Sequence, residues 1–237
     1  MGLRRSLCDD AAMERELLAY TNAILFTVAA LLPIVNPLGS APIFLALTAD
    51  LPVDVRHHAA AIVGRYCFLL LAAAMLVGTY VLQIFGVSLP IVRVAGGLLV
   101  TANGWRLLHD PAPGLPETRP ADTWEREAAR RAFYPLTFPL TVGPGSISIA
   151  ITLGAQSQGG TGWGSAEIAA ALVGVALVAI SVFLSYRFAW RLIAYLGETG
   201  TAVFLRLSSF ILLCVGVSIV WSGIVDLLQP LIESSRP

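Results

Sequence analysis

The chain has 237 residues, of which 57% are hydrophobic and only 13% are charged, and fifteen basic side chains balance fifteen acidic ones. A soluble domain carries roughly a quarter charged residues, so this composition predicts a chain that lies mostly in lipid. It argues against a soluble enzyme, and the zero net charge gives no reason to expect nucleic acid as a partner.

Residues 1–20 form a polar tail before the first apolar run. Basic and acidic side chains are mixed in this tail, which is not the pattern of a secretory signal. Met1 and Met13 are both candidate translation starts.

The first predicted span, residues 21–49, carries no charge and exceeds the roughly 20 residues that a helix needs to cross a bilayer. It contains three prolines, among them Pro37 and Pro42, and a proline in a helix interior costs about 3 kcal/mol or more. Asn36 precedes a proline and is pushed out of helical geometry. We predict that the backbone opens from Asn36 to Pro42 and that a helix resumes at Ile43.

Residues 66–92 and 89–108 predict the second and third spans. Arg93 begins the third span, either as an interfacial arginine or as an intramembrane charge that binds a carboxylate or pairs with carbonyls. Asn103 lies in the middle of this span, where an amide either holds helices together or contacts a ligand.

Residues 109–131 are the one long polar segment between apolar runs. Four prolines precede a charged stretch in it, which predicts a loop that ends in a short surface helix. His57 and His58 follow the first span, where we expect solvated loop side chains rather than metal ligands. No residues stand at metal-ligand spacing, so neither a metal nor a cofactor is expected.

The fourth span lies within residues 132–166 and repeats the pattern of the first. Gly143 and Gly145 permit backbone angles that other residues avoid, and Pro144 suits the first turn of a resumed helix. We therefore predict a second broken helix here.

Residues 168–186 and 207–228 complete six spans, before a short tail at 230–237. All six are predicted to be helices, because the edges of an open sheet stay unpaired in lipid. Arg206 begins the sixth span. Asp226 lies near its end and is predicted to be an interfacial carboxylate, with a proton carrier as the alternative.

Two halves of the chain, residues 21–108 and 132–229, resemble each other and are predicted to be three-span repeats. Matching positions occur in the same order in both halves: Pro37 and Pro42 with Pro139 and Pro144, residues 59–64 with 169–174, Gly86 with Gly197, and Arg93 with Arg206. Three spans are an odd number, so the halves insert in opposite orientations as a 3+3 inverted repeat. The arginine-rich polar segments are predicted to be cytoplasmic, which places both termini outside.

The two breaks are the predicted binding site. Unwound backbone at membrane depth is tolerated where it is buried in protein or lines a wet cavity, and a half-helix N-terminus there attracts an anionic group. The alternative is a pair of proline kinks closed by tight packing. The candidate substrate-binding residues are Asn36, Pro37, Gly39, Ser40, Pro42, Thr141, Gly143, Pro144, Gly145, Ser146 and Ser148. The candidates for gating or charge pairing are Arg93, Arg206 and Asn103.

Residues 36–45 (NPLGSAPIFL) and 139–147 (PLTVGPGSI) resemble the two hallmark motifs of the MarC family of bacterial and archaeal membrane proteins. Residues 93–99 and 206–212 resemble that family's third and sixth spans. The resemblance implies a multi-pass protein of the cell (inner) membrane, related to neutral amino-acid transporters and LysE-like exporters. It carries over no catalytic residues, because none are established for the family.

We predict a secondary transporter, with export as one direction, of a small zwitterionic solute such as a neutral amino acid. The polar but uncharged breaks suit a ligand whose own charges cancel. A channel or exporter of an ion or drug, and a non-transporting membrane scaffold, remain as alternatives. No catalytic motif supports an enzyme. The expected partners are membrane lipid and the solute, and homo-oligomerisation stays open.

Overall fold

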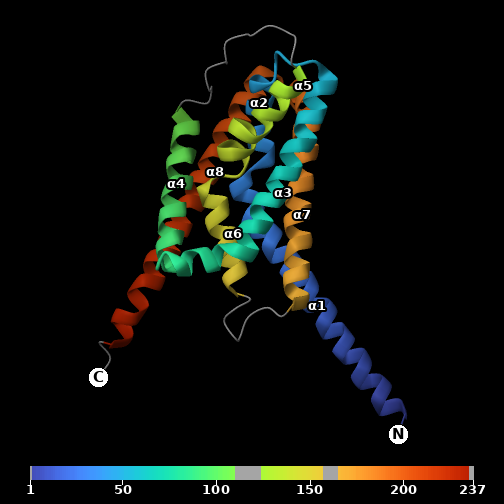
Figure 1. Cartoon of the computed structure of the whole chain (residues 1–237), viewed down its shortest axis with the longest axis vertical. Coiled ribbons are helices and arrows are strands. Elements are labelled where there is room, and N and C mark those ends of the chain that lie inside the picture. Colours follow the sequence, from blue (N-terminus) through green and yellow to red (C-terminus); the bar gives the residue numbers. More distant parts are fainter. Residues whose placement is uncertain (1, 110–123, 157–164, 235–237) are drawn as a thin grey trace.

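A computed structural model describes residues 2–109, 124–156 and 165–234. Every regular element in these ranges is a helix, which confirms the all-α prediction. Figure 1 shows an elongated bundle in which the first residues of α1 and the last turns of α8 project from the same end. The helices of the first half are α1 (Gly2–Val35), α2 (Pro37–Leu47), α3 (Val53–Ile84) and α4 (Leu89–His109). Those of the second half are α5 (Trp124–Arg131), η1 (Ala132–Thr141), α6 (Pro144–Gln156), α7 (Ser165–Arg187) and α8 (Ala189–Ser234).

The first break is shorter than predicted. Only Asn36 leaves helical geometry, with a left-handed φ of 45°, and α2 resumes at once with Pro37. Asparagine tolerates this conformation as a single residue, and proline fits the first position of a helix because no intrahelical bond is lost there. The prediction that the backbone stays open to Pro42 is therefore wrong: Pro42 lies inside α2.

The second break is longer and lies close to where the sequence places it. Tyr134 and Phe138, each followed by a proline, leave helical geometry within the π-helical segment η1, and Val142 is extended. A residue before proline is driven toward extended backbone, which explains both positions. Pro144 then begins α6 as predicted, and the chain bends by 71° between the two helical pieces. Residues 157–164 of the predicted fourth run lie outside the described residues.

Four described helices are long and apolar enough to cross a membrane, or five if the bent pair of η1 and α6 counts as one span. The four lie at Leu17–Val35, Val53–Ile84, Ala166–Arg187 and Thr199–Gln229. They correspond to predicted spans one, two, five and six. Helix α4 matches the bounds of the third predicted span, but it is not among them, so the count of six is not confirmed.

Two local predictions need correction or extension. His57 and His58 lie in the first turns of α3 and not on a loop, because α3 begins at Val53, well before the predicted second span. The charged end of the central segment does form the short helix α5, whereas the proline-rich part at 110–123 lies outside the described residues.

Glycines let helices α4 and α8 lie against each other along most of α4 (Figure 1). A Cβ atom built on Gly216 would lie 2.5 Å from the backbone nitrogen of Thr101, and one on Gly97 would lie 2.7 Å from that of Val220. Such distances are too short for any side chain. The two backbones therefore approach as closely as small residues allow, which is the usual way in which helices associate in lipid.

The core lies where α2 and α3 meet the second half of the chain. Helix α3 packs on η1, α6 and α7, while α2 packs on α7 and α8. Phe44, Val63, Leu71 and Leu136 are fully buried at the centre of this cluster. This packing buries the polar side chains beside the two helix breaks, Ser40 and Thr141.

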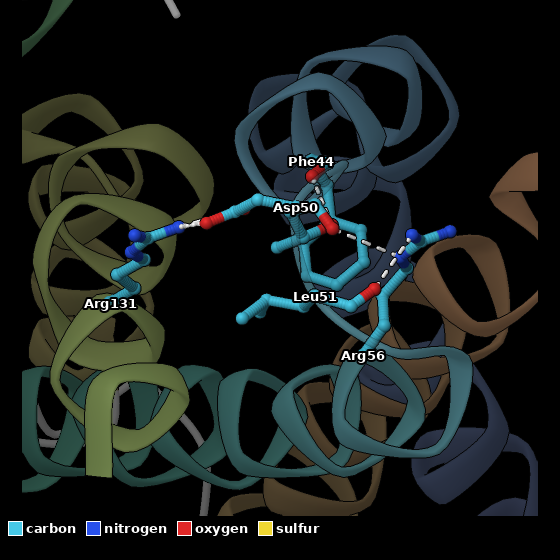
Figure 2. A network of polar contacts seen from close by, with 6 residues as sticks. Phe44, Asp50, Leu51, Arg56 and Arg131 are labelled. Atoms are coloured by element: carbon cyan, nitrogen blue, oxygen red, sulfur yellow. Dashed lines mark hydrogen bonds and ion pairs between the residues drawn. The ribbon is translucent and has the colours of Figure 1, made fainter. Parts of the chain in front are cut away.

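Two arginines clamp the end of α2 (Figure 2). Arg131, at the end of α5, binds both carboxylate oxygens of Asp50 at 2.9 Å. Arg56 of α3 donates to the carbonyl oxygens of Thr48 at 3.2 Å and Leu51 at 3.1 Å. These contacts tie the turn after α2 to elements on both sides of it.

Candidate functional site

The two helix breaks meet at a single buried side chain, Tyr186 of α7. Its hydroxyl donates to Ser40 Oγ of α2 at 3.0 Å and shares a hydrogen bond of 2.7 Å with Thr141 Oγ1 of η1. Its ring stacks on Phe44 of α2, with centroids 4.4 Å apart. Tyr186 is 1% exposed, so its hydroxyl is buried in the protein. One oxygen atom thus joins segments separated by a hundred residues of sequence.

Asn36 caps the half-helix that follows the first break. Its side-chain oxygen accepts a hydrogen bond from the Gly39 N–H at 3.2 Å, which satisfies one of the free donors at the start of α2. Ser40 Oγ donates back to the Asn36 carbonyl at 2.9 Å. A Cβ atom on Gly39 would lie 2.3 Å from the Asn36 amide nitrogen, so the cap needs glycine at this position.

Threonine and serine hydroxyls satisfy the backbone around the second break. Thr137 Oγ1 donates to the Ala132 carbonyl at 2.5 Å and Thr141 Oγ1 to the Leu136 carbonyl at 2.6 Å. Beyond the break, Ser146 Oγ donates to the Gly143 carbonyl at 2.9 Å. Each hydroxyl is thus satisfied by a nearby backbone carbonyl, and these side chains are polar but uncharged.

A second polar contact lies further along α6, where it meets α4. Ser148 Oγ donates to the Val92 carbonyl at 2.9 Å, and Arg93 Nε donates to Thr152 Oγ1 at 3.4 Å. Arg93 also forms an ion pair with Asp226 of α8. Three helices from different parts of the chain therefore meet at Arg93.

Comparison with known proteins identifies the family. The family model described as "MarC family integral membrane protein" matches residues 21–228. The chain belongs to the MarC family. It is 31% identical over 206 residues to the "UPF0056 inner membrane protein MarC" of Escherichia coli O1:K1 / APEC, covering 84% of this chain and 92% of the relative. The Citrobacter koseri protein of the same name is 31% identical over 208 residues, with the same coverage.

These relatives, together with the apolar helices, establish this MarC-family chain as a multi-pass inner-membrane protein. The predicted location and the predicted family are both confirmed. No solved structure matches the chain. The names of these relatives state a location and no activity.

The structure brings some of the predicted site residues of this MarC-family chain together. Ser40 and Thr141 meet through Tyr186, while Ser146 and Ser148 lie on α6 just beyond the second break. Gly145 packs against α4, because a Cβ atom there would lie 2.0 Å from Val100 Cγ2. The prolines and glycines of the predicted set shape the breaks: Pro37 and Pro144 begin helices, Pro42 lies within α2, and Gly39 and Gly143 flank hydrogen-bonded turns.

The three candidates for gating or charge pairing lie in different environments. Arg93 is paired with Asp226 of α8, so charge pairing is the role that the structure shows for Arg93, and the interfacial position of Asp226 stays a prediction. Asn103 is exposed on α4 and Arg206 is exposed on α8. Within the described residues neither has an ion-pair partner, and neither lies at the breaks.

Two residues that the sequence did not single out complete the site. Tyr186 ends an apolar span directly before Arg187. A tyrosine in such a span needs a hydrogen-bond partner if its hydroxyl is buried, and this was the signal in the sequence that could have identified it. Thr152 lies one helical turn beyond Ser148 on α6 and receives Arg93. A threonine in an apolar helix gives no comparable signal by itself.

Proposed function

We propose that this chain is a secondary transporter of a small zwitterionic solute, such as a neutral amino acid, that binds where the two helix breaks meet. The observation that carries the proposal is the Tyr186 hydroxyl, which bridges Ser40 and Thr141 in a buried position. Irregular backbone within a membrane protein is tolerated where it is buried in protein or lines a cavity, and paired broken helices mark binding sites in transporter folds.

The chemistry of the breaks supports a solute that is polar but carries no net charge. The hydroxyls of Ser40, Thr141 and Tyr186 are neutral, and none of the residues of the two breaks is ionisable at neutral pH. Helix α6 begins at Pro144 and presents the positive end of its dipole, which favours a carboxylate. The Asn36 carbonyl at the other break accepts from the N–H and the hydroxyl of Ser40, and it would receive an ammonium group in place of that hydroxyl. A zwitterion satisfies both ends without burying net charge.

The hydroxyls at the breaks are bonded to one another in this structure. A solute that enters must take over the hydrogen bonds that Tyr186 now makes with Ser40 and Thr141. Under this proposal, the arrangement in which these hydroxyls bond one another closes the binding site. Exchange of partners at these three hydroxyls would couple solute binding to the relative position of α2 and η1.

The proposed architecture is six crossings in a 3+3 inverted repeat, with α4 as the third. Gly86 and Gly197, which the sequence aligns, have positive φ values of 64° and 68°. Corresponding helices of the two halves also make corresponding contacts. Helix α3 packs on η1 and α6, and its counterpart α7 packs on α1 and α2. Helix α4 packs on α6, and its counterpart α8 packs on α2. These correspondences support a pseudo-twofold relation between the halves.

Both termini are proposed to lie outside the cytoplasm. The arginine distribution favours this orientation, and α1 begins at the same end of the bundle at which α8 finishes (Figure 1). An even number of crossings requires the two termini to share a side of the membrane.

The test is flux in proteoliposomes that contain the purified protein, measured for a panel of labelled neutral, acidic and basic amino acids. We expect saturable flux for one or more small neutral amino acids and a large loss of that flux when Ser40 and Thr141 are both changed to alanine. Ser218→Ala is the matched control, because Ser218 is an exposed hydroxyl on α8. Folded wild-type protein without saturable flux for any amino acid would contradict the proposal.

A further inference from the structure

The ion pair between Arg93 and Asp226 is an unusual feature of helices that otherwise associate through small residues. It joins Nη1 of Arg93 on α4 to Oδ2 of Asp226 on α8, with the side chains 23% and 31% exposed. Gly223 lies on the same face of α8, close to the backbone of α4, so the helices pack tightly beside the pair. Ionisable groups within membrane helices are rare and usually serve a function.

One face of α6 connects this ion pair with the second helix break. Gly145, Ser148 and Thr152 follow one another at intervals of three and four residues and therefore share a face. This face lies against α4: a Cβ atom on Gly96 would lie 2.5 Å from Ser148 Cβ, and Arg93 reaches Thr152. Two polar side chains, Ser148 and Thr152, thus lie on the face of α6 that leads from the break to the ion pair.

The charges at this place restrict which ligand can enter. A ligand with one charge would pair with one side chain and leave the other charged group partly buried without a partner, which is unfavourable. A zwitterion leaves no charge unpaired, because its carboxylate binds the arginine and its ammonium group binds the aspartate. In an α-amino acid these groups are attached to one carbon atom, so both can reach side chains that already touch each other.

We infer that Arg93 and Asp226 are specificity-determining residues that open their ion pair to bind the carboxylate and the ammonium group of an α-amino acid. This inference rests on the proposed function. It adds a second binding site for the same solute, further along α6 from the break. A purely structural role, in which the pair only fastens α4 to α8, is the competing explanation. The two differ in what they predict for ligand charge.

The test compares three ligands of similar size with purified protein in lipid nanodiscs: alanine, propionate and ethylamine. Calorimetric titration of the wild type should detect alanine and neither singly charged ligand at the same concentrations. Asp226→Asn should weaken alanine binding by at least about tenfold and strengthen propionate binding, because an unpaired arginine remains. Arg93→Gln should weaken alanine binding in the same way and strengthen ethylamine binding.

Two further variants separate binding from folding. Asp50→Asn removes a carboxylate of similar exposure from the other described ion pair, and it should leave the ligand preference unchanged. Arg93→Lys keeps the positive charge but loses the planar fork that binds a carboxylate with two hydrogen bonds. It should weaken alanine binding by about threefold or more, and it remains informative if the neutral variants do not fold.

The outcomes distinguish this inference from the function on which it rests. Wild-type protein that binds no amino acid would overturn both. Wild-type protein that binds alanine, with variants at Arg93 and Asp226 that keep the wild-type preference for alanine, would overturn the inference alone and leave the pair a structural contact.

Discussion

Replacing Tyr186 with phenylalanine removes the one oxygen atom that joins the two helix breaks. The ring can still stack on Phe44, so the substitution leaves packing almost unchanged and isolates the two hydrogen bonds. Ser40 and Thr141 keep their bonds to backbone carbonyls and are not left without partners. The expected cost is therefore that of the bonds themselves and not that of buried unsatisfied groups.

The magnitude follows from the number of bonds lost. A hydrogen bond between membrane helices contributes about 0.6 kcal/mol on average, and a buried bond in a soluble protein about 1 kcal/mol. Two such bonds amount to about 1–2 kcal/mol. We expect the Tyr186→Phe variant to lose this much free energy of unfolding, which shifts the folded-to-unfolded ratio by a factor of roughly 5 to 30.

Reversible unfolding in mixed detergent micelles, followed by circular dichroism, measures this difference. Tyr80→Phe is the matched control, because Tyr80 is 55% exposed on α3 and should change stability by less than about 0.5 kcal/mol. A double-mutant cycle with Ser40→Ala should show coupling between the two positions. A Tyr186→Phe variant as stable as the wild type, with no coupling to Ser40, would refute the bridge between the breaks.

Three other predictions concern packing, the α2 clamp and orientation. Gly154→Ala should destabilise the protein by about 3 kcal/mol, because its Cβ atom would lie 1.8 Å from the Met75 carbonyl oxygen. Gly200→Ala should cost much less, because its Cβ atom would meet only the Leu196 side chain, at 3.3 Å. The same unfolding assay checks both variants. Asp50→Asn and Arg131→Gln should show a coupling energy of about 0.5–1 kcal/mol in a double-mutant cycle, since the pair is only partly buried, and a coupling of zero would contradict the clamp. Reporter fusions active only outside the cytoplasm should give signal at both termini, and opposite results at the two ends would contradict six crossings.

Prolines and glycines allowed the helix breaks to be predicted, but not their extent. The beginning of α6 at Pro144 follows from local chemistry, because proline fits the first helical turn. The length of the first break does not follow, since Pro42 is accommodated inside α2. The cost of the missing hydrogen bond there depends on tertiary packing, and the buried α2 is held by the helices around it.

Contacts between distant segments could not be read from the sequence. Tyr186 meets Ser40 and Thr141 because α7 packs on α2 beside η1, and no local pattern encodes that arrangement. For the same reason, the sequence did not indicate that Asp226 is the partner of Arg93. An arginine and an aspartate 133 residues apart each look interfacial in the sequence, and only the packing of α4 on α8 brings them together.

Protection of a cysteine at the first break tests the central claim most directly. Ser40→Cys would be introduced after Cys8, Cys67 and Cys214 have been replaced by alanine, and its rate of labelling by a small thiol reagent would be measured in proteoliposomes. If the solute binds where the breaks meet, the neutral amino acid that the protein transports should slow this labelling in a saturable way. Labelling at the same rate with and without that amino acid would contradict the claim that the breaks form the binding site.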